Sequence, residues 1–112
     1  MRFSANQRLR KAGDFQEVRK GGVRINCGCF IANVLKNLLG IRRFGVIAST
    51  KVGNAVRRNR AKRVFREIFR LNQELLPESV DIVIVVRNNF EDYSYKDLTE
   101  RFVRLCENLK NQ

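Results

Sequence analysis

The fold of this chain is decided by residues 51–70, whose sequence is KVGNAVRRNRAKRVFREIFR. This stretch has eight Lys and Arg residues but a single acid, Glu67. Apolar residues recur within and just beyond it at helical spacing, namely Ala61, Val64, Phe65, Ile68 and Leu75. Polar residues fall on the opposite side, namely Asn59, Lys62, Arg63, Arg66 and Arg70. The pattern therefore predicts one long helix with an apolar face for packing and a cationic face directed outward.

The positive charge of the chain is concentrated around this helix. The 112 residues have a net charge of +12, of which residues 1–70 carry +15 and residues 71–112 carry −3. Arg is more frequent than Lys, and its planar fork matches phosphate groups. In a protein whose basic surface served only solubility, the positive charge would be spread more evenly along the chain. We therefore expect a polyanionic partner, with nucleic acid preferred to an anionic membrane surface.

The segment before the long helix predicts an arm, a short helix and a strand region. Residues 1–13 are polar and basic, and we expect an extended or loosely held arm. Asp14 and Glu17 have the spacing of a capping box. The box predicts a helix from about Phe15 to Lys20 that ends at Gly21-Gly22. From Val23 to Lys36 the pattern is strand-like, and Gly28 within it suggests a bulge or bend.

The rest of the chain predicts two more strands and two helices. Residues 43–49 form a strand pattern, and Asn54 is a suitable N-cap for the long helix, which should end near Leu75, before Pro77. Residues 80–86 are apolar on both faces, which is typical of a central strand. The last helix, after a cap-like start at residues 94–97, carries its apolar residues at helical spacing: Leu98, Phe102, Leu105 and Leu109.

These elements predict an α+β fold: a single-domain α/β sandwich of residues 1–112, with helices packed on a small mixed sheet. The expected order is a helix, two or three strands, the long helix, a strand and a final helix. The chain shows no signal peptide and no apolar run long enough to cross a membrane. Three cysteines without framework spacing favour a reducing, cytoplasmic setting, with Cys27 and Cys29 at alternate positions on one strand face and Cys106 further on.

The sequence contains no catalytic constellation. Histidine is absent, and a cysteine nucleophile would have no activating base. Glu91 and Asp92 could touch a metal ion, but adjacent loop acids are more often solvated turn residues. We therefore expect neither catalytic nor metal-ligating residues in this chain. By contrast, Arg58, Asn59 and Arg60 place three hydrogen-bonding side chains near a helix N-terminus, where phosphate is favoured.

At these residues the chain resembles the bacterial ribonuclease P protein family. The resemblance extends from residues 14–16 through Gly22, Phe30, the strand into Ser49 and residues 81–87 to the last helix. It implies a protein that assists a catalytic RNA in removing the 5′ leader of precursor tRNA, with Mg²⁺ held mainly by the RNA. It also implies a left-handed β-α-β crossover, as in a ribosomal protein domain, although most such crossovers are right-handed. A monomer is implied, with one protein per RNA.

The resemblance assigns two surfaces. The residues expected at the catalytic RNA are Lys51, Asn54, Arg58, Asn59, Arg60, Lys62, Arg63 and Arg66, with Gly53 nearby. The residues expected in a cleft for the single-stranded leader are Phe15, Arg19, Asn33 and Ser49. Arg19 and Asn33 stand where aromatic residues are common in the family, and Arg19 could stack on a base through its guanidinium plane. Phe15 can equally be a plain core residue.

Two other classes of protein remain open at this stage. A small basic ribosomal or other structural RNA-binding protein would share the basic surface without any role in cleavage. A protein-only nuclease would need a cluster of carboxylates, which the sequence does not show.

Overall fold

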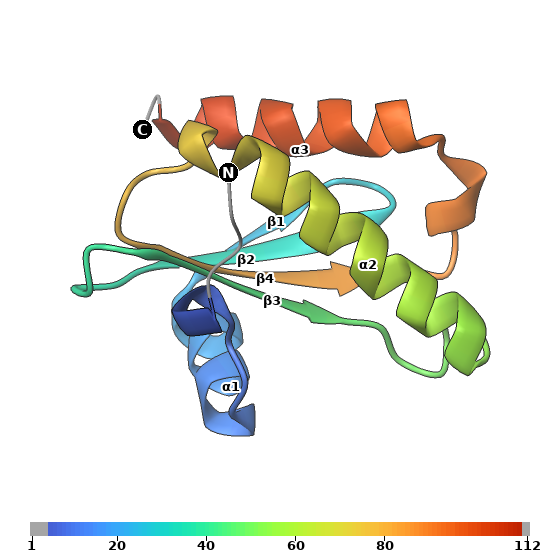
Figure 1. The fold of residues 1–112 in the computed structure, drawn as a ribbon, viewed down its shortest axis with the longest axis horizontal. Coiled ribbons are helices and arrows are strands. Elements are labelled where there is room, and N and C mark those ends of the chain that lie inside the picture. Colours follow the sequence, from blue (N-terminus) through green and yellow to red (C-terminus); the bar gives the residue numbers. More distant parts are fainter. Residues whose placement is uncertain (1–4, 111–112) are drawn as a thin grey trace.

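A computed structural model describes residues 5–110 and shows a four-stranded sheet with helices on both faces (Figure 1). The main elements are α1 (Ala12–Gly21), β1 (Val23–Asn26), β2 (Phe30–Lys36), β3 (Arg42–Ile47), α2 (Ala55–Asn72), β4 (Val80–Val86) and α3 (Tyr95–Lys110). Three short 3₁₀ turns accompany them, η1 (Ala5–Gln7), η2 (Gln73–Leu75) and η3 (Phe90–Asp92). The α+β order predicted from the sequence is confirmed, with three strands before the long helix.

The sheet is mixed and has the strand order β1-β2-β4-β3. β2 pairs antiparallel with β1 and β4, whereas β3 pairs parallel with β4. α2 provides the connection between the two parallel strands. With β3 and β4 pointing to the right in Figure 1, β3 lies nearer the viewer and α2 lies above them, so the crossover is left-handed.

β4 is the strand on which both halves of the core are built. Its alternate residues Ile82 and Ile84 pack in the large cluster formed with α2 and α3. Val83 points to the other face, into a smaller cluster with Leu9 and Val18. Burial on both faces explains why this strand is almost continuously apolar. The predicted central position of β4 is therefore confirmed.

The apolar face of α2 lies on the sheet. Ala61, Phe65 and Ile68 are buried as predicted, and the ring of Phe65 meets that of Phe30 edge-on at 5.1 Å. Phe69, which lies outside the predicted stripe, is also buried and stacks on Phe44 with 4.7 Å between ring centroids.

The end of the long helix differs from the prediction. α2 ends at Asn72, and the chain continues as the 3₁₀ turn η2. The tighter winding of a 3₁₀ turn rotates the side chains relative to an α-helix. Leu75 is consequently 36% exposed, and Leu76 is fully buried in its place.

The start of α1 also differs from the prediction. The helix begins at Ala12, and its N-cap, Lys11, makes no side-chain cap. Asp14 lies inside the first turn, where its amide donates to the carbonyl of Lys11, so the predicted capping box is wrong. The helix ends at Gly21 as expected. Position 22, just after the helix, requires glycine, because a Cβ there would lie 2.5 Å from the carbonyl oxygen of Val18.

Of the bulge or bend predicted at Gly28, the bend is confirmed, and it forms the hairpin turn between β1 and β2. Gly28 has a φ of +86°, which favours glycine, and its amide donates to Oδ1 of Asn26 over 2.9 Å. Cys27 and Cys29 flank this turn, so their predicted place on one strand face is wrong. The turn made by Asn26 and Gly28 interrupts the strand, although the apolar residues continue to alternate in the sequence through Cys27 and Cys29.

The described part of the N-terminal segment is held against the sheet. Leu9 is buried, and its amide donates to the carbonyl of Phe44 over 2.9 Å. Gln7 donates through Nε2 to Gln73 over 2.6 Å and to the carbonyl of Arg42 over 3.1 Å. Residues 5–10 are therefore anchored, while residues 1–4 of the predicted arm lie outside the described residues.

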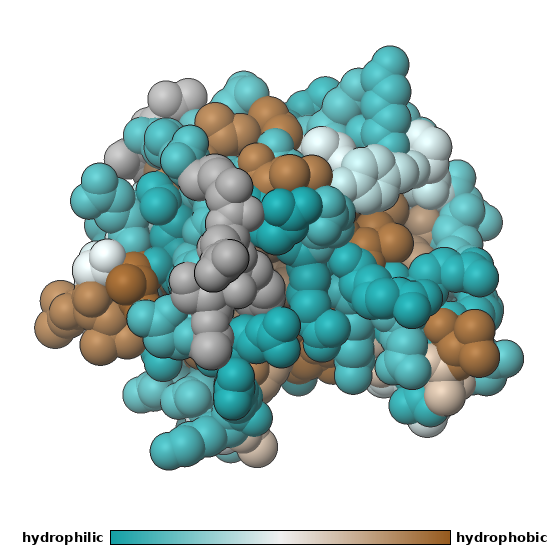
Figure 2. Space-filling view, viewed as in Figure 1, coloured by the Kyte–Doolittle hydropathy of each residue, from teal (hydrophilic) through white to brown (hydrophobic). Residues whose placement is uncertain are grey.

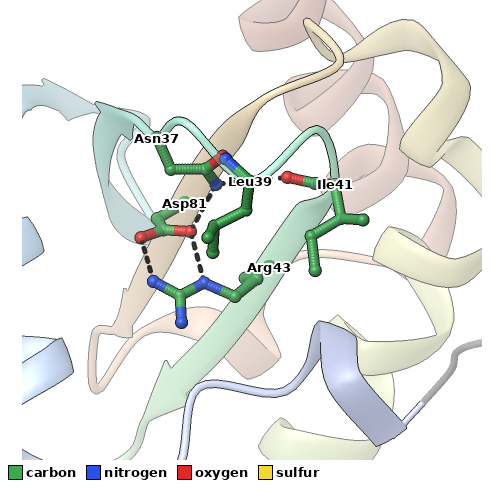
Figure 3. Close-up of polar contacts among 5 residues, drawn as sticks. All are labelled: Asn37, Leu39, Ile41, Arg43 and Asp81. Atoms are coloured by element: carbon green, nitrogen blue, oxygen red, sulfur yellow. Dashed lines mark hydrogen bonds and ion pairs between the residues drawn. The ribbon is translucent and has the colours of Figure 1, made fainter.

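A buried carboxylate fixes the end of the sheet where β4 begins (Figure 3). Asp81 is 4% exposed and accepts two hydrogen bonds from Arg43, at 2.8 and 2.7 Å. Asn37 donates to Asp81 over 2.8 Å and to the carbonyl of Ile41 over 3.1 Å. These contacts join β3, β4 and the β2–β3 turn.

Replacing Asp81 with Asn should lower the free energy of unfolding by about 2 kcal/mol, because the paired Arg43 loses charged hydrogen bonds. Urea unfolding measures the change. Asp92→Asn is the matched control, since it removes the same charge from an exposed residue. Equal effects of the two changes would show that the Asp81 contacts do not stabilise the fold.

Candidate nucleic-acid interface

The N-terminal end of α2 is held by a short, well-anchored loop. Val52 in this loop is buried, and its amide donates to the carbonyl of Ser49. Gly53 has a φ of +146°, and a Cβ there would lie 2.7 Å from the side chain of Arg57. Asn54 caps the helix as predicted, accepting from the amide of Arg57 over 3.0 Å. Lys51 is exposed on this loop.

The cations of α2 fall into two groups according to their partners. Arg57 and Arg60 both donate to the carboxylate of Glu91, Arg60 over 2.8 Å. Arg70 pairs with Glu67 on the same helix. The second group consists of Arg58, Lys62, Arg63 and Arg66, for which the described residues provide no ion pair. This second group leaves a row of uncompensated charge along the helix.

Arg58 is the most unusual member of the row. Its Nε atom is buried and has no hydrogen-bond partner within the described residues. A buried donor without a partner is rare in folded proteins and costs free energy. The neighbouring Asn59 is exposed. This end of α2 is therefore suited to donate hydrogen bonds to an acceptor outside the chain's own residues, such as a phosphate group.

Glu91 is the acidic partner of two arginines of α2. The hydrogen bond from Arg57, assisted by that from Arg60, lowers the pKa of its carboxyl group. Among residues 5–110, no three His, Cys, Asp or Glu side chains gather as metal ligands. The expectation that Glu91 and Asp92 ligate no metal ion stays a prediction.

A cleft lies between α1 and the sheet, on the face opposite α2. It has a volume of about 380 Å³ and is lined by Arg19 and Lys20 of α1 and by Arg24, Ile31 and Asn33 of the sheet. Asn33 is buried at its floor. The structure therefore brings Arg19 and Asn33 together in a hollow that also contains Lys20 and Arg24.

Phe15 does not line this cleft. Its half-buried ring lies against Gly45 of β3, where a Cβ would be 2.5 Å from the ring. It packs beside the Leu9 and Val18 cluster and also lines a separate hollow with Lys62 and Arg66. Both interpretations of Phe15 are compatible with this position, because part of the ring is core and part is accessible.

Ser49, the fourth residue assigned to the leader cleft, lines neither hollow. It lies just past the end of β3, where its Oγ accepts from the amide of Lys51 over 3.3 Å. This hydrogen bond helps to hold the loop that leads into α2.

The face of α2 that is turned toward the viewer is mainly hydrophilic (Figure 2). The apolar protrusion at the left of this view is the β2–β3 turn, where Leu38 and Leu39 are exposed. Within residues 5–110, no helix combines the length and the apolar character needed to cross a bilayer.

The structure adds residues that sequence reasoning did not assign to a site. Arg8 and Arg10 line the same hollow as Phe15, Lys62 and Arg66, because the N-terminal segment is anchored beside β3. Their basic character is visible in the sequence. Their proximity to α2 is not, because it depends on contacts between residues more than 50 positions apart.

The cysteines offer no nucleophile. All three are free thiols. Burial raises the pKa of Cys27 to about 11 and that of Cys106 to about 12, and it also raises the pKa of Cys29. Since the thiolate is the reactive form, these groups are protonated and unreactive near neutral pH.

A small α+β domain with a row of unpaired cations on one helix and a second cation-lined cleft is typical of a nucleic-acid-binding protein. Comparison with known proteins identifies the family. A family model described as Ribonuclease P matches residues 3–110. The chain is 41% identical over 106 residues to the ribonuclease P protein component of Fusobacterium nucleatum, covering 91% of this chain and 96% of that protein.

Solved structures agree. The RNase P protein from Thermotoga maritima matches with a TM-score of 0.81 at 33% identity, covering 90% of this chain and 96% of that one. The Staphylococcus aureus RNase P protein matches with a TM-score of 0.80 at 26% identity, covering 92% and 97%. The chain belongs to the ribonuclease P protein family. It is thus a protein component of an endoribonuclease, with an RNA partner.

Thiol reactivity provides a test of the raised pKa values of half-buried Cys27 and buried Cys106. In the native protein at pH 8, alkylation of Cys27 and Cys106 by iodoacetamide should be at least about tenfold slower than in urea, because a raised pKa removes thiolate. Mass spectrometry of timed samples measures each rate. Native rates equal to those in urea would contradict the assigned burial.

Proposed function

We propose that this chain acts by binding RNA and performs no chemistry of its own. Its α2 surface would hold the catalytic RNA of ribonuclease P, and its α1–sheet cleft would hold the 5′ leader of precursor tRNA. Leader removal would then be catalysed by the RNA. The observation that carries this proposal is the row formed by Arg58, Lys62, Arg63 and Arg66, which has no counter-charge within the described residues.

Electrostatics explains how such a row assists cleavage. A folded RNA and a precursor tRNA repel each other through their phosphates, and cations placed between them offset that repulsion. Arg63 is exposed, whereas Lys62 and Arg66 are half-buried and therefore better fixed in position. Arg57 and Arg60 can join the row when phosphate replaces Glu91, whose carboxylate occupies the same donors.

The cleft between α1 and the sheet is suited to single-stranded RNA. Arg19, Lys20 and Arg24 supply charge for phosphates, and Ile31 and Val85 supply an apolar floor. None of the described residues that line the cleft is aromatic, so they provide no ring for stacking there. We therefore propose that the leader is held here chiefly by charge and by the guanidinium plane of Arg19.

Magnesium belongs to the RNA in this proposal. The described carboxylates do not gather into a ligand set, and Asp81 and Glu91 are held by arginine. Lys51 and Asn54, at the start of α2, would lie near the bound RNA without ligating the ion.

Reconstitution tests the proposal. The protein should increase cleavage of the leader by ribonuclease P RNA at low Mg²⁺, because its cations replace part of the screening that the ion otherwise supplies. Gel analysis of the cleaved leader measures the rate. Tight RNA binding without any increase in cleavage would instead indicate a structural RNA-binding protein.

A pair of variants separates free from compensated cations. Arg63→Ala should weaken binding to ribonuclease P RNA and reduce the slope of log affinity against log salt by roughly 0.7 to 0.9, the value for one phosphate contact. Arg70→Ala, on the same helix, should have a much smaller effect because Arg70 is paired with Glu67. Filter binding across a salt series measures both, and equal losses would contradict the assignment.

A further inference from the structure

We infer that the open edge of β1, beside α3, is a docking groove for an extended peptide that joins the four-stranded sheet as a further strand. The peptide that fits this groove carries an acidic side chain and, two residues later, an apolar one. The partner is therefore another protein, and the inference does not rest on the proposed RNA-binding role.

The outer side of β1 presents backbone hydrogen-bonding groups. Within the described residues β1 pairs only with β2. At the hairpin the amide of Cys27 donates to the carbonyl of Phe30, so the backbone groups of Cys27 face β2. These groups alternate in direction along a strand, so those of Ile25 also face β2, whereas those of Arg24 and Asn26 face away from the sheet. An antiparallel peptide strand can therefore pair with Arg24 and Asn26.

α3 turns this edge into a groove. Ile25 packs against the large core cluster to which α3 contributes, so its side chain lies on the α3 face of the sheet. Val23, two residues earlier, shares that face. Two hollows of about 380 Å³ each lie between this side of the sheet and α3, which runs along the sheet in Figure 1. The first lies beside residues 25–28 and the second beside Val23, so alternate side chains of one added strand can reach both.

The first hollow is built around a fixed arginine. Nη1 of Arg101 donates to the carbonyl of Cys27 over 2.8 Å, and its Cζ atom lies 4.6 Å from the centroid of the Tyr93 ring. Glycine at position 28 makes room for it, because a Cβ there would lie 2.9 Å from Nη1. Arg104, three residues further on, is exposed in the same hollow. A carboxylate of the peptide would thus meet one arginine that is already held in place and a second beside it.

These two arginines have no acidic partner among residues 5–110. Asp97 and Glu100 line an adjoining hollow with them, but neither forms an ion pair or a hydrogen bond with Arg101 or Arg104. The nearby acids reduce the local positive charge without occupying the arginine donors. An acidic side chain from outside the chain can therefore still bind there.

The second hollow is mainly apolar. Its apolar lining consists of Val23, Val34, Pro77, Val80 and Leu109. Val23 is 55% exposed, so an apolar side chain placed against it would remove apolar surface from water on both partners. The only charged side chains among its described lining residues are Lys36 and Lys110. An apolar residue of the peptide fits here, two positions after the acidic one.

Charge and shape favour a peptide over other occupants. No described residue that lines either hollow is acidic, and none is aromatic. Single-stranded RNA would therefore find no ring on which to stack a base. A second copy of the chain would bring the same arginines to the shared edge and a further net charge of +12.

A simpler explanation is that β1 is only a protected edge. Short edge strands with charged side chains avoid pairing with other chains, and β1 has four residues including Arg24. Protection of this kind predicts no affinity for a peptide. It also does not require paired hollows between the strand and a helix.

Hydrogen exchange of the protein without RNA tests the inference. The probe is a short capped peptide of serine and threonine that contains one glutamate and, two positions later, one leucine. NMR should show that exchange of the Arg24 and Asn26 amides with water slows about tenfold at a peptide concentration about ninefold above its dissociation constant, because only the free form exchanges. The Ile25 amide, which already faces β2, should change much less.

Three outcomes of this experiment would overturn the inference. The first is unchanged exchange at Arg24 and Asn26 while the peptide binds elsewhere or not at all. The second is equal protection of these amides by a short oligouridylate, which would identify RNA as the occupant. The third is protection that rises with protein concentration without peptide, which would identify a second copy of the chain.

A backbone variant tests the strand pairing itself. Arg24→Pro removes the outward amide but no hydrogen bond to β2, so the fold should persist while peptide binding is lost. Arg24→Ala is the matched control, and it should keep most of the affinity because the Arg24 side chain lies on the opposite face, in the cleft beside α1. Equal losses for the two variants would contradict strand addition.

A second pair of variants tests the acidic contact without changing the backbone of β1. Arg104→Ala should weaken peptide binding about two- to fivefold, in the range of an exposed ion pair. Lys96→Ala, an exposed cation of α3 outside both hollows, is the charge-matched control and should have little effect. With glutamine in place of the peptide glutamate, the effect of Arg104→Ala should disappear. Equal losses for Arg104→Ala and Lys96→Ala would show that only net charge matters.

Discussion

Burial of β4 on both faces is the constraint on which the rest of the structure depends. Ile82 and Ile84 require a cover on one side, which α2 and α3 provide. Val83 requires a cover on the other, which α1 and the N-terminal segment provide through Val18 and Leu9. Because burial of apolar area is the dominant favourable term in folding, a short chain with one modest core has little freedom to place these helices elsewhere.

The same packing determines where the charge goes. Phe65, Ile68 and Phe69 commit one side of α2 to the sheet, so the cations on its other side must face outward. Acids could have neutralised them, but the described acids reach only the two ends of the helix, through Glu91 and Glu67. The middle of α2 is left as an unbalanced row, which suits a polyanion and makes its binding sensitive to salt.

The sequence predicted the elements whose patterns are long and repeated. β4 was predicted at its observed bounds, and the cap at Asn54 and the stripe through Ala61, Phe65 and Ile68 are confirmed. The predictions were wrong where a few local contacts outweigh the periodicity of apolar residues. Cys27 and Cys29 flank a turn instead of sharing a strand face, because Asn26 satisfies the amide of Gly28. Leu75 is exposed because a 3₁₀ turn ends the helix.

The sequence by itself determined the class of fold, the cationic face of α2 and the family to which the chain belongs. Each of these is encoded by periodicity, charge or motif within a continuous segment. Only the tertiary structure decided which cations are compensated, because Glu91 lies 31 residues beyond Arg60. It alone separated Phe15 from Arg19 and Asn33 and placed it with Lys62 and Arg66. Such proximities follow from the packing of α1 and α2 at the edge of one sheet, which no local pattern records.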